Sequence, residues 1–141
     1  MSALPGNSVA SRIAWKPGVC NDGRMALRVL IVDDHPGFRA RARALLESEG
    51  FEVVGEAGSG ADGVRTAREL APDVVLLDVQ LPDTDGFAVA SAVIGESGDV
   101  QVVLTSSRDG SDFGALVGSC GACGFIAKAE LSGDALAMLA A

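Results

Sequence analysis

The chain has 141 residues, of which 48% are hydrophobic and 21% charged, and its 19 acidic and 11 basic residues give a formal net charge of -8. This length allows one compact domain and little more, and the composition excludes wholesale disorder. The acidic balance also excludes a protein whose main role is to neutralise nucleic-acid phosphates, because that role needs clustered Lys and Arg.

Residues 1–26 differ in pattern from the rest of the chain. They contain two turn signals, Pro5-Gly6 and Pro17-Gly18, and no sustained hydrophobic periodicity. We predict a flexible N-terminal extension over 1–26 and one folded domain over 27–141. Met25 directly precedes the first strand-like segment, which makes it an alternative translation start.

From residue 27 onward, short apolar runs alternate with segments of helical periodicity. Runs rich in Val, Ile and Leu, each ended by a polar residue, are typical of strands buried on both faces of a parallel sheet. The predicted strands are 27–32, 51–54, 74–77, 100–104 and 124–127, and the predicted helices are 38–49, 61–71, 87–94, 112–120 and 131–139. This alternation predicts an α/β fold with a doubly wound, five-stranded parallel sheet.

Targeting and redox signals are sparse. No apolar run approaches the roughly 20 residues of a membrane helix, and the N-terminus lacks the basic and apolar segments of a signal peptide. The three cysteines, Cys20, Cys120 and Cys123, are too few for a disulfide framework and fit a reducing compartment. We therefore expect a cytoplasmic protein with no membrane partner.

Polar side chains follow four of the predicted strands, at the sheet edge where open α/β folds bind ligands. They are Asp33, Asp34, Asp78, Thr105, Ser106 and Lys128. Three carboxylates placed together repel one another, and a hard cation such as Mg²⁺ removes that cost. Lys128 is one of only two lysines in the chain and adds a single positive charge at this edge. The set favours transfer of a phosphoryl group onto a carboxylate.

Four motifs, LRVLIVDDHPGFR, VVLLDVQLPDTDG, VVLTSSRD and GACGFIAK, together resemble the receiver domain of bacterial two-component response regulators. The resemblance covers residues 27 to 139 and is greatest to receivers that precede a helix-turn-helix output domain. It implies a flavodoxin-like fold with strand order 2-1-3-4-5. It also implies a phosphorelay protein that is not an enzyme and promotes only its own phosphoryl transfer and hydrolysis.

The resemblance implies a phosphoacceptor and a Mg²⁺ site. Asp78 matches the aspartate that accepts the phosphoryl group from a sensor histidine kinase or phosphotransfer protein. Asp34 and Asp78 match the side-chain ligands of Mg²⁺, and Gln80 matches the residue whose backbone carbonyl binds the metal. Asp33 matches the acid that acts largely through water.

The resemblance also implies a switch. Lys128 matches the lysine that contacts the phosphoryl group, and Phe125 matches the aromatic that changes rotamer. Thr105 and Ser106 compete for the role of the switch hydroxyl, and the usual spacing back from Lys128 favours Ser106. Gln80 and Arg108 occupy positions that tune the lifetime of the phosphoryl group in this family.

The output of the switch is expected to be a protein partner. The chain stops at Ala141 after one short predicted helix, whereas a helix-turn-helix domain needs roughly 60 more residues. We therefore expect a stand-alone receiver, or one that has lost its output domain, with an unknown downstream protein partner and no direct DNA binding. The alternative function is a receiver-like interaction module that signals without phosphorylation.

Three further patterns have competing interpretations. Strand-to-helix junctions commonly carry Asp as a helix cap, which would explain Asp34 or Asp85 singly. The segment 58–63, GSGADG, matches the dinucleotide fingerprint G-x-G-x-x-G, although the preceding strand reads as a half-exposed edge. The C-x-x-C pair Cys120 and Cys123 favours small buried side chains over a metal or redox site, because too few further ligands are near.

One further group of charges lies on the first predicted helix. Arg39, Arg41 and Arg43 are most simply a solvated helix face. In the family that the chain resembles, this helix contributes to docking of the kinase. A surface for a protein partner is therefore the second interpretation of these arginines.

Overall fold

The computed structural model describes residues 27–96, 99–107 and 120–140, which contain a five-stranded parallel sheet in the order β2-β1-β3-β4-β5. The strands are β1 (Arg28–Val32), β2 (Glu52–Ala57), β3 (Val74–Asp78), β4 (Gln101–Ser106) and β5 (Gly124–Ala127). All four pairings between neighbouring strands are parallel. The predicted doubly wound sheet and its strand order are therefore confirmed.

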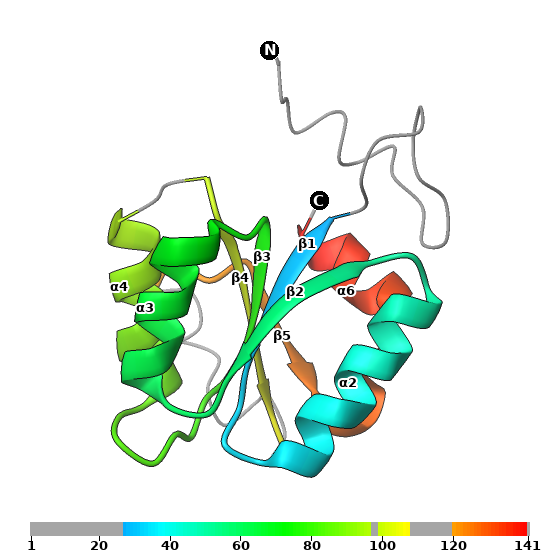
Figure 1. Cartoon of the computed structure of the whole chain (residues 1–141), viewed down its shortest axis with the longest axis horizontal. Helices are drawn as coiled ribbons and strands as arrows, with labels where there is room; N and C mark the ends of the chain where they lie inside the picture. Colours follow the sequence, from blue (N-terminus) through cyan, green and yellow to red (C-terminus); the bar gives the residue numbers. More distant parts are fainter. Residues whose placement is uncertain (1–26, 97–98, 108–119, 141) are drawn as a thin grey trace.

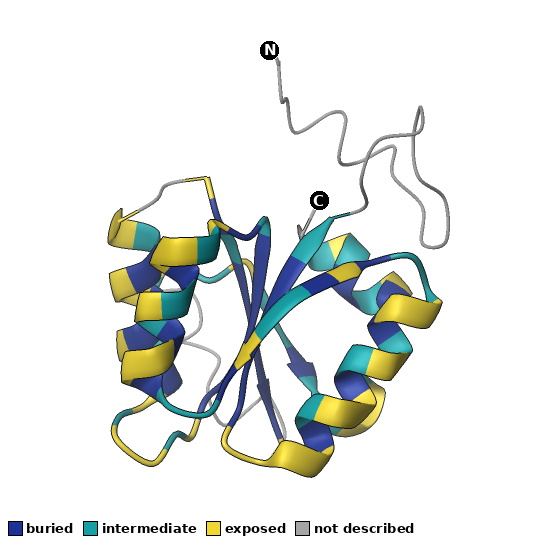
Figure 2. Ribbon diagram, viewed as in Figure 1, coloured by how far each residue is buried: buried dark blue, intermediate teal, exposed yellow. Residues whose placement is uncertain are grey.

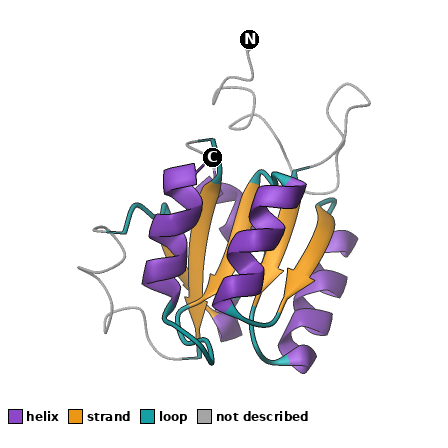
Figure 3. Ribbon diagram, turned by 60° about the vertical axis from the view of Figure 1, so that its left-hand side comes forward, coloured by secondary structure: helices purple, strands orange, loops and turns teal. Residues whose placement is uncertain are grey.

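Helices cover both faces of the sheet (Figures 1 and 3). The helices are α2 (Pro36–Ser48), α3 (Gly60–Leu70), α4 (Gly86–Glu96) and α6 (Gly133–Ala140), and a 3-10 turn, η3 (Lys128–Glu130), follows β5. Helices α2 and α6 pack on one face, and α3 and α4 pack on the other. The predicted helix over 112–120 and the predicted extension over 1–26 lie almost wholly outside the described residues.

Each sheet face carries its own hydrophobic core. The first core joins Val29, Ile31 and Leu76 of the sheet to Phe38 and Leu46 of α2. The second core holds the residues that alternate with these along β1, β3 and β4, together with apolar residues of α3 and α4. Strands β1 and β3 are dark blue along almost their whole length in Figure 2, because they are buried on both faces. Burying each large aliphatic side chain contributes about 1.5–3 kcal/mol, so these central strands hold the site rigidly.

The predicted element boundaries differ from the observed ones in two informative places. Strand β2 is predicted to end at residue 54 but runs to Ala57, because its pairing with β1 continues through Gly55 and Glu56. Helix α2 begins two residues earlier than predicted, at Pro36, whose fixed φ suits the first helical position. Gly50 lies just beyond the C-cap of this helix with φ +97°, a left-handed conformation that favours glycine.

A carboxylate from a distant loop caps helix α3. Asp83 accepts hydrogen bonds from the backbone N–H groups of Gly60 and Ala61, at 2.8 and 3.0 Å. Ser59 adds the usual N-cap by accepting from the N–H of Asp62. These bonds lower the pKa of the Asp83 carboxyl, because they favour its charged form at the positive end of the helix dipole.

Replacing Asp83 with asparagine is therefore expected to destabilise the fold at neutral pH. The folded-state pKa of Asp83 lies below its unfolded value, so its stabilisation is complete above the unfolded pKa and is lost as the pH falls through the folded pKa. Urea unfolding of wild type and Asp83→Asn should therefore differ most near neutrality and converge in acid. Asp99→Asn, at an exposed aspartate in the turn before β4, is the control and should follow wild type throughout.

No helix in the described part of the chain is long and apolar enough to cross a membrane.

Candidate functional site

The carboxyl ends of the central strands bring the predicted site residues to one edge of the sheet. Asp33 directly follows β1, Asp78 is the last residue of β3, and Lys128 directly follows β5. The ladder continues past these strand ends, because Asp33 N–H donates to the Ala57 carbonyl and Val79 N–H donates to the Thr105 carbonyl, both at 2.9 Å. Backbone hydrogen bonds therefore fix the positions of the acidic residues.

Three carboxylates and one imidazole lie together at this edge. One oxygen each from Asp33, Asp34 and Asp78 and one ring nitrogen of His35 all lie within 4.8 Å of one another. Asp33 is completely buried and Asp78 is 3% exposed, whereas Asp34 and His35 lie at the surface. Nδ1 of His35 lies 3.1 Å from Oδ1 of both Asp33 and Asp34. His35 is a member of this cluster that the sequence motifs do not assign, although it directly follows the acidic pair.

Lys128 supplies the positive charge inside the cluster. Its Nζ lies 2.7 Å from Oδ2 of Asp33 and 3.5 Å from Oδ2 of Asp78, and its side chain is only 15% exposed. The same Nζ lies 4.6 Å from the centroid of the Phe38 ring. A largely shielded cation between two buried carboxylates compensates part of their desolvation and mutual repulsion.

Burial is the main cause that raises the pKa of the Asp78 carboxyl, and the charge of Asp33 raises it further. The Gln80 N–H group, which donates to Oδ1 of Asp78 at 3.2 Å, lowers this pKa, and so does Lys128. Burial has the largest effect, so the net shift is upward. Asp78 is therefore a carboxylate held in an environment that disfavours its charge, which makes a bound cation favourable.

The loop after Asp78 turns back closely on the strand. Gly86 N–H donates to the Val79 carbonyl at 2.6 Å, and a side chain at residue 86 would collide with the Asp78 carbonyl. Glycine is therefore required here by the close backbone approach. Asp85 caps α4 by accepting from the Ala88 N–H at 2.8 Å, so the capping interpretation holds for Asp85. It does not hold for Asp34, because the N-cap of α2 is His35 and makes no side-chain cap bond.

The two hydroxyls at the end of β4 point to opposite faces of the sheet, because side chains alternate along a strand. Thr105 pairs with Asp78 of β3 and with Ile126 of β5, on the face of the first core. Ser106 pairs with Ala127, two residues along the strands from the pairing of Leu104 with Phe125. Ser106 and Phe125 are thus diagonal neighbours on the face of α3 and α4.

Thr105 is fully buried, and its Oγ1 has no hydrogen-bond partner among the described residues. A buried hydroxyl without a partner costs about 1–3 kcal/mol. Thr105→Val keeps the shape of the side chain and removes that hydroxyl. We expect it to raise the free energy of unfolding by about 1 kcal/mol in urea titrations. Ser106→Val, at a buried serine that takes part in a polar interaction, is the comparison and should lower it. A loss of stability in Thr105→Val would contradict this.

The dinucleotide interpretation of segment 58–63 is not supported. Gly60 opens α3 against the side chain of Thr84, and Gly63 faces Val32, so both glycines allow close packing of the helix. The N–H groups of Gly60 and Ala61, which would hold a phosphate, already bind the Asp83 carboxylate. The preceding strand is the edge strand β2, not a central strand.

The interpretation of the C-x-x-C pair as small buried side chains is wrong for Cys123, which is exposed, while Cys120 is half-buried. The thiol of Cys123 nevertheless donates to the Val102 carbonyl at 3.1 Å, and partial desolvation of this thiol raises its pKa. A reactive or metal-binding cysteine needs the opposite shift. In the part of the chain that the structure describes, neither cysteine lies in a cluster of three or more potential metal ligands.

Two of the three helix arginines are not free in solvent, so the prediction of a solvated face is wrong for them. Arg39 and Arg43 both form ion pairs with Glu56 of β2, at 3.1 and 3.2 Å. Arg39 also donates to the backbone carbonyl of Asp33. These contacts tie α2 to the edge strand. Arg41 is the exposed member of the set.

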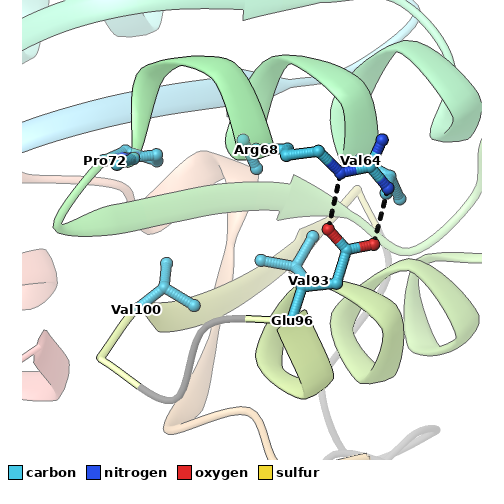
Figure 4. A pocket seen from close by; sticks show the side chains of 8 residues that line it. Val64, Arg68, Pro72, Val93, Glu96 and Val100 are labelled. Atoms are coloured by element: carbon cyan, nitrogen blue, oxygen red, sulfur yellow. Dashed lines mark hydrogen bonds and ion pairs between the residues drawn. The ribbon is translucent and has the colours of Figure 1, made fainter.

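A small, mostly apolar hollow lies between α3 and α4, away from the acidic cluster (Figure 4). Val64, Val93 and Val100 are among the residues that line it. Arg68 and Glu96 bridge it through two parallel hydrogen bonds of 2.8 Å. The Arg68–Glu96 pair links the two helices across the hollow. The hollow adds no further charged group to the acidic cluster.

Comparison with known proteins agrees with this geometry. A family model described as the response regulator receiver domain matches residues 29–140. BvgA of Bordetella pertussis is 40% identical over 103 residues, which cover 73% of this chain and 49% of that protein. Response regulator UvrY of Escherichia coli is 36% identical over 103 residues, covering 72% of this chain and 47% of that protein. The chain thus spans about half the length of the curated relatives it matches.

Solved structures show the same fold. A two-component response regulator of the LuxR family from Aurantimonas superposes with a TM-score of 0.74 and 32% identity, over 82% of this chain and 86% of that one. A chain of the CheX-CheY-BeF3-Mg+2 complex from Borrelia burgdorferi gives a TM-score of 0.76 with 25% identity, over 86% and 92% of the two chains.

Proposed function

Because the chain belongs to the response regulator receiver domain family, we propose that it is a phosphoacceptor switch whose acceptor is Asp78. One observation carries the proposal. The ammonium group of Lys128 lies between the carboxylates of Asp33 and Asp78, and Asp34 and His35 complete the same cluster within 4.8 Å. This arrangement gathers an acidic nucleophile, a cation and further oxygen ligands at one strand edge.

The donor set fits Mg²⁺. Oxygen ligands are what this ion prefers, and two of the three clustered carboxylates are buried with one lysine to balance them. In the proposal, Asp34 and Asp78 hold the ion with the Gln80 carbonyl, and Asp33 acts through water. When bound, Mg²⁺ would neutralise the carboxylates and the incoming phosphoryl oxygens.

In the proposed reaction an oxygen of Asp78 attacks the phosphorus of a phosphohistidine on a sensor kinase or phosphotransfer protein. The new O–P bond forms as the P–N bond breaks, and the imidazole nitrogen keeps the electron pair of that bond. Gln80 N–H holds one Asp78 oxygen, and Lys128 lies beside the other. Lys128 then pairs with the phosphoryl group, whose charge replaces that of the carboxylate.

The proposed readout uses the opposite face of the same strands. Ser106 would turn its hydroxyl towards the phosphoryl group, and Phe125, its diagonal neighbour, would follow inward. The surface around β5 would then change its affinity for a downstream protein. We propose that the domain acts through protein contacts and not by binding DNA itself, consistent with the acidic charge of the chain.

Acetyl phosphate with Mg²⁺ provides the test. We expect the intact mass to rise by one phosphoryl group in the presence of Mg²⁺ and to stay unchanged with a chelator. Peptide mapping should place the group on Asp78. The alternative, an interaction module that needs no phosphorylation, would be favoured if the chain bound Mg²⁺ and a partner but took no phosphoryl group from acetyl phosphate or a kinase.

A further inference from the structure

An aromatic ring lies against the ammonium group of the site. Phe38 belongs to the first turn of α2 and is 6% exposed, and its ring centroid lies 4.6 Å from Nζ of Lys128. The ring thus forms the third neighbour of this ammonium, after the carboxylates of Asp33 and Asp78. A cation within about 6 Å of an aromatic face is attracted by the electron density of the ring.

The ring differs from the two carboxylates in a way that matters for phosphoryl transfer. Asp33 and Asp78 are the groups that a divalent cation or a phosphoryl group would engage, so their hold on Lys128 changes with the state of the site. The ring of Phe38 carries no charge and is fixed in the first core. Its attraction for the ammonium therefore persists in every state.

Lys128 needs such a hold because its side chain is long and lies at the end of a short element. Strand β5 ends at Ala127, and Lys128 opens a three-residue 3-10 turn. A flexible four-carbon stem in this position can extend its charged end into water. The Phe38 ring lies against the ammonium group of Lys128 and thereby keeps it in the acidic cluster.

We propose that Phe38 is a positioning residue for phosphoryl transfer, which holds the Lys128 ammonium over the acceptor through a cation–π contact. The inference rests on the proposed function. Phe38 does not touch the reacting atoms and acts only through Lys128. Arg41 lies 6.0 Å from the same ring but is exposed, so its contact is weaker and Arg41→Ala serves as a control.

The contact itself can be measured without phosphorylation, because Lys16 and Lys128 are the only lysines in the chain. In protein labelled with ¹³C lysine, the ε-CH₂ protons of Lys128 should be shifted upfield by the ring current of Phe38, and Lys128→Arg assigns the signal. Phe38→Leu should abolish that shift, and Arg41→Ala should preserve it. An unshifted Lys128 signal in the wild type would overturn the proposal.

Progressive fluorination separates the cation–π contact from packing. Fluorinated phenylalanines placed at residue 38 alone keep the ring size and withdraw electron density from its face. The rate of phosphorylation by acetyl phosphate with Mg²⁺ should fall stepwise with fluorination, and Phe38→Leu should lose about tenfold, the size of a partly desolvated cation–π contact. A rate that is independent of fluorination would overturn the positioning role.

Phe51→Leu is the matched control for stability. Phe51 is 4% exposed in the same core but directly precedes β2, at the amino ends of the strands and so away from the acidic cluster. The Phe51→Leu variant should lose as much stability as Phe38→Leu but keep the wild-type rate of phosphorylation. If wild type itself takes no phosphoryl group, the proposed function fails, and the ring-current experiment still decides the contact between Phe38 and Lys128.

Discussion

We expect an Asp78→Asn variant to take up phosphoryl groups from acetyl phosphate or from a kinase at least about a thousandfold more slowly than wild type. The amide keeps the size of the side chain but removes the nucleophilic oxygen charge that forms the O–P bond. The measurement is the intact mass over time with excess Mg²⁺. Phosphoryl uptake at the wild-type rate would show that Asp78 is not the acceptor.

The same variant should be more stable than wild type at neutral pH. The folded-state pKa of Asp78 is raised, chiefly by burial, so the folded protein holds this proton more tightly than the unfolded chain. The ionised group therefore destabilises the fold, and this cost grows as the pH rises from the unfolded pKa through the folded pKa. Urea titrations should show a gain for Asp78→Asn at neutrality that shrinks in acid.

Replacing Lys128 with methionine should produce the largest loss of stability at the site. The variant keeps most of the apolar stem but leaves the buried Asp33 and Asp78 without their counter-charge. Breaking a buried ion pair from one side costs about 3–5 kcal/mol, and we expect about 3 kcal/mol in urea unfolding without divalent cations. The rate of phosphorylation should fall as well.

Mg²⁺ should restore part of the stability that Lys128→Met loses, because a bound divalent cation neutralises the same carboxylates. A ligand at about one hundred times its dissociation constant adds about 2.7 kcal/mol to a fold that binds it. Asp34→Asn in the Lys128→Met background is the control and should weaken this rescue. If Mg²⁺ stabilised neither wild type nor Lys128→Met, the acidic cluster would not be a magnesium site.

Much of the fold follows from the sequence because the central strands are buried on both faces. Continuous apolar runs located β1, β3 and β4 to within one or two residues, and the polar residues after them marked the functional edge. The gathering of Asp33, Asp78 and Lys128 follows from topology alone, since parallel strands end at one edge. The edge strand β2 is harder to delimit, because Gly55 and Glu56 interrupt its apolar run.

The remaining features depend on packing that periodicity does not encode. His35 and Phe38 reach the site because α2 begins at Pro36, with only one residue between it and the acidic pair. The predicted start at residue 38 does not reveal this. The ion pairs of Arg39 and Arg43 depend on Glu56 of the neighbouring strand. The opposite orientations of Thr105 and Ser106 depend on the strand register, and only the structure supplies it.

The loop that follows Asp78 has a second attachment, outside the acidic cluster, through the bonds of Asp83 to the first turn of α3. A displacement of this loop therefore strains two amide hydrogen bonds on a different helix. The amide protons of Gly60 and Ala61 become natural reporters of events at the acceptor, and their solvent exchange can be followed without any label at the site itself.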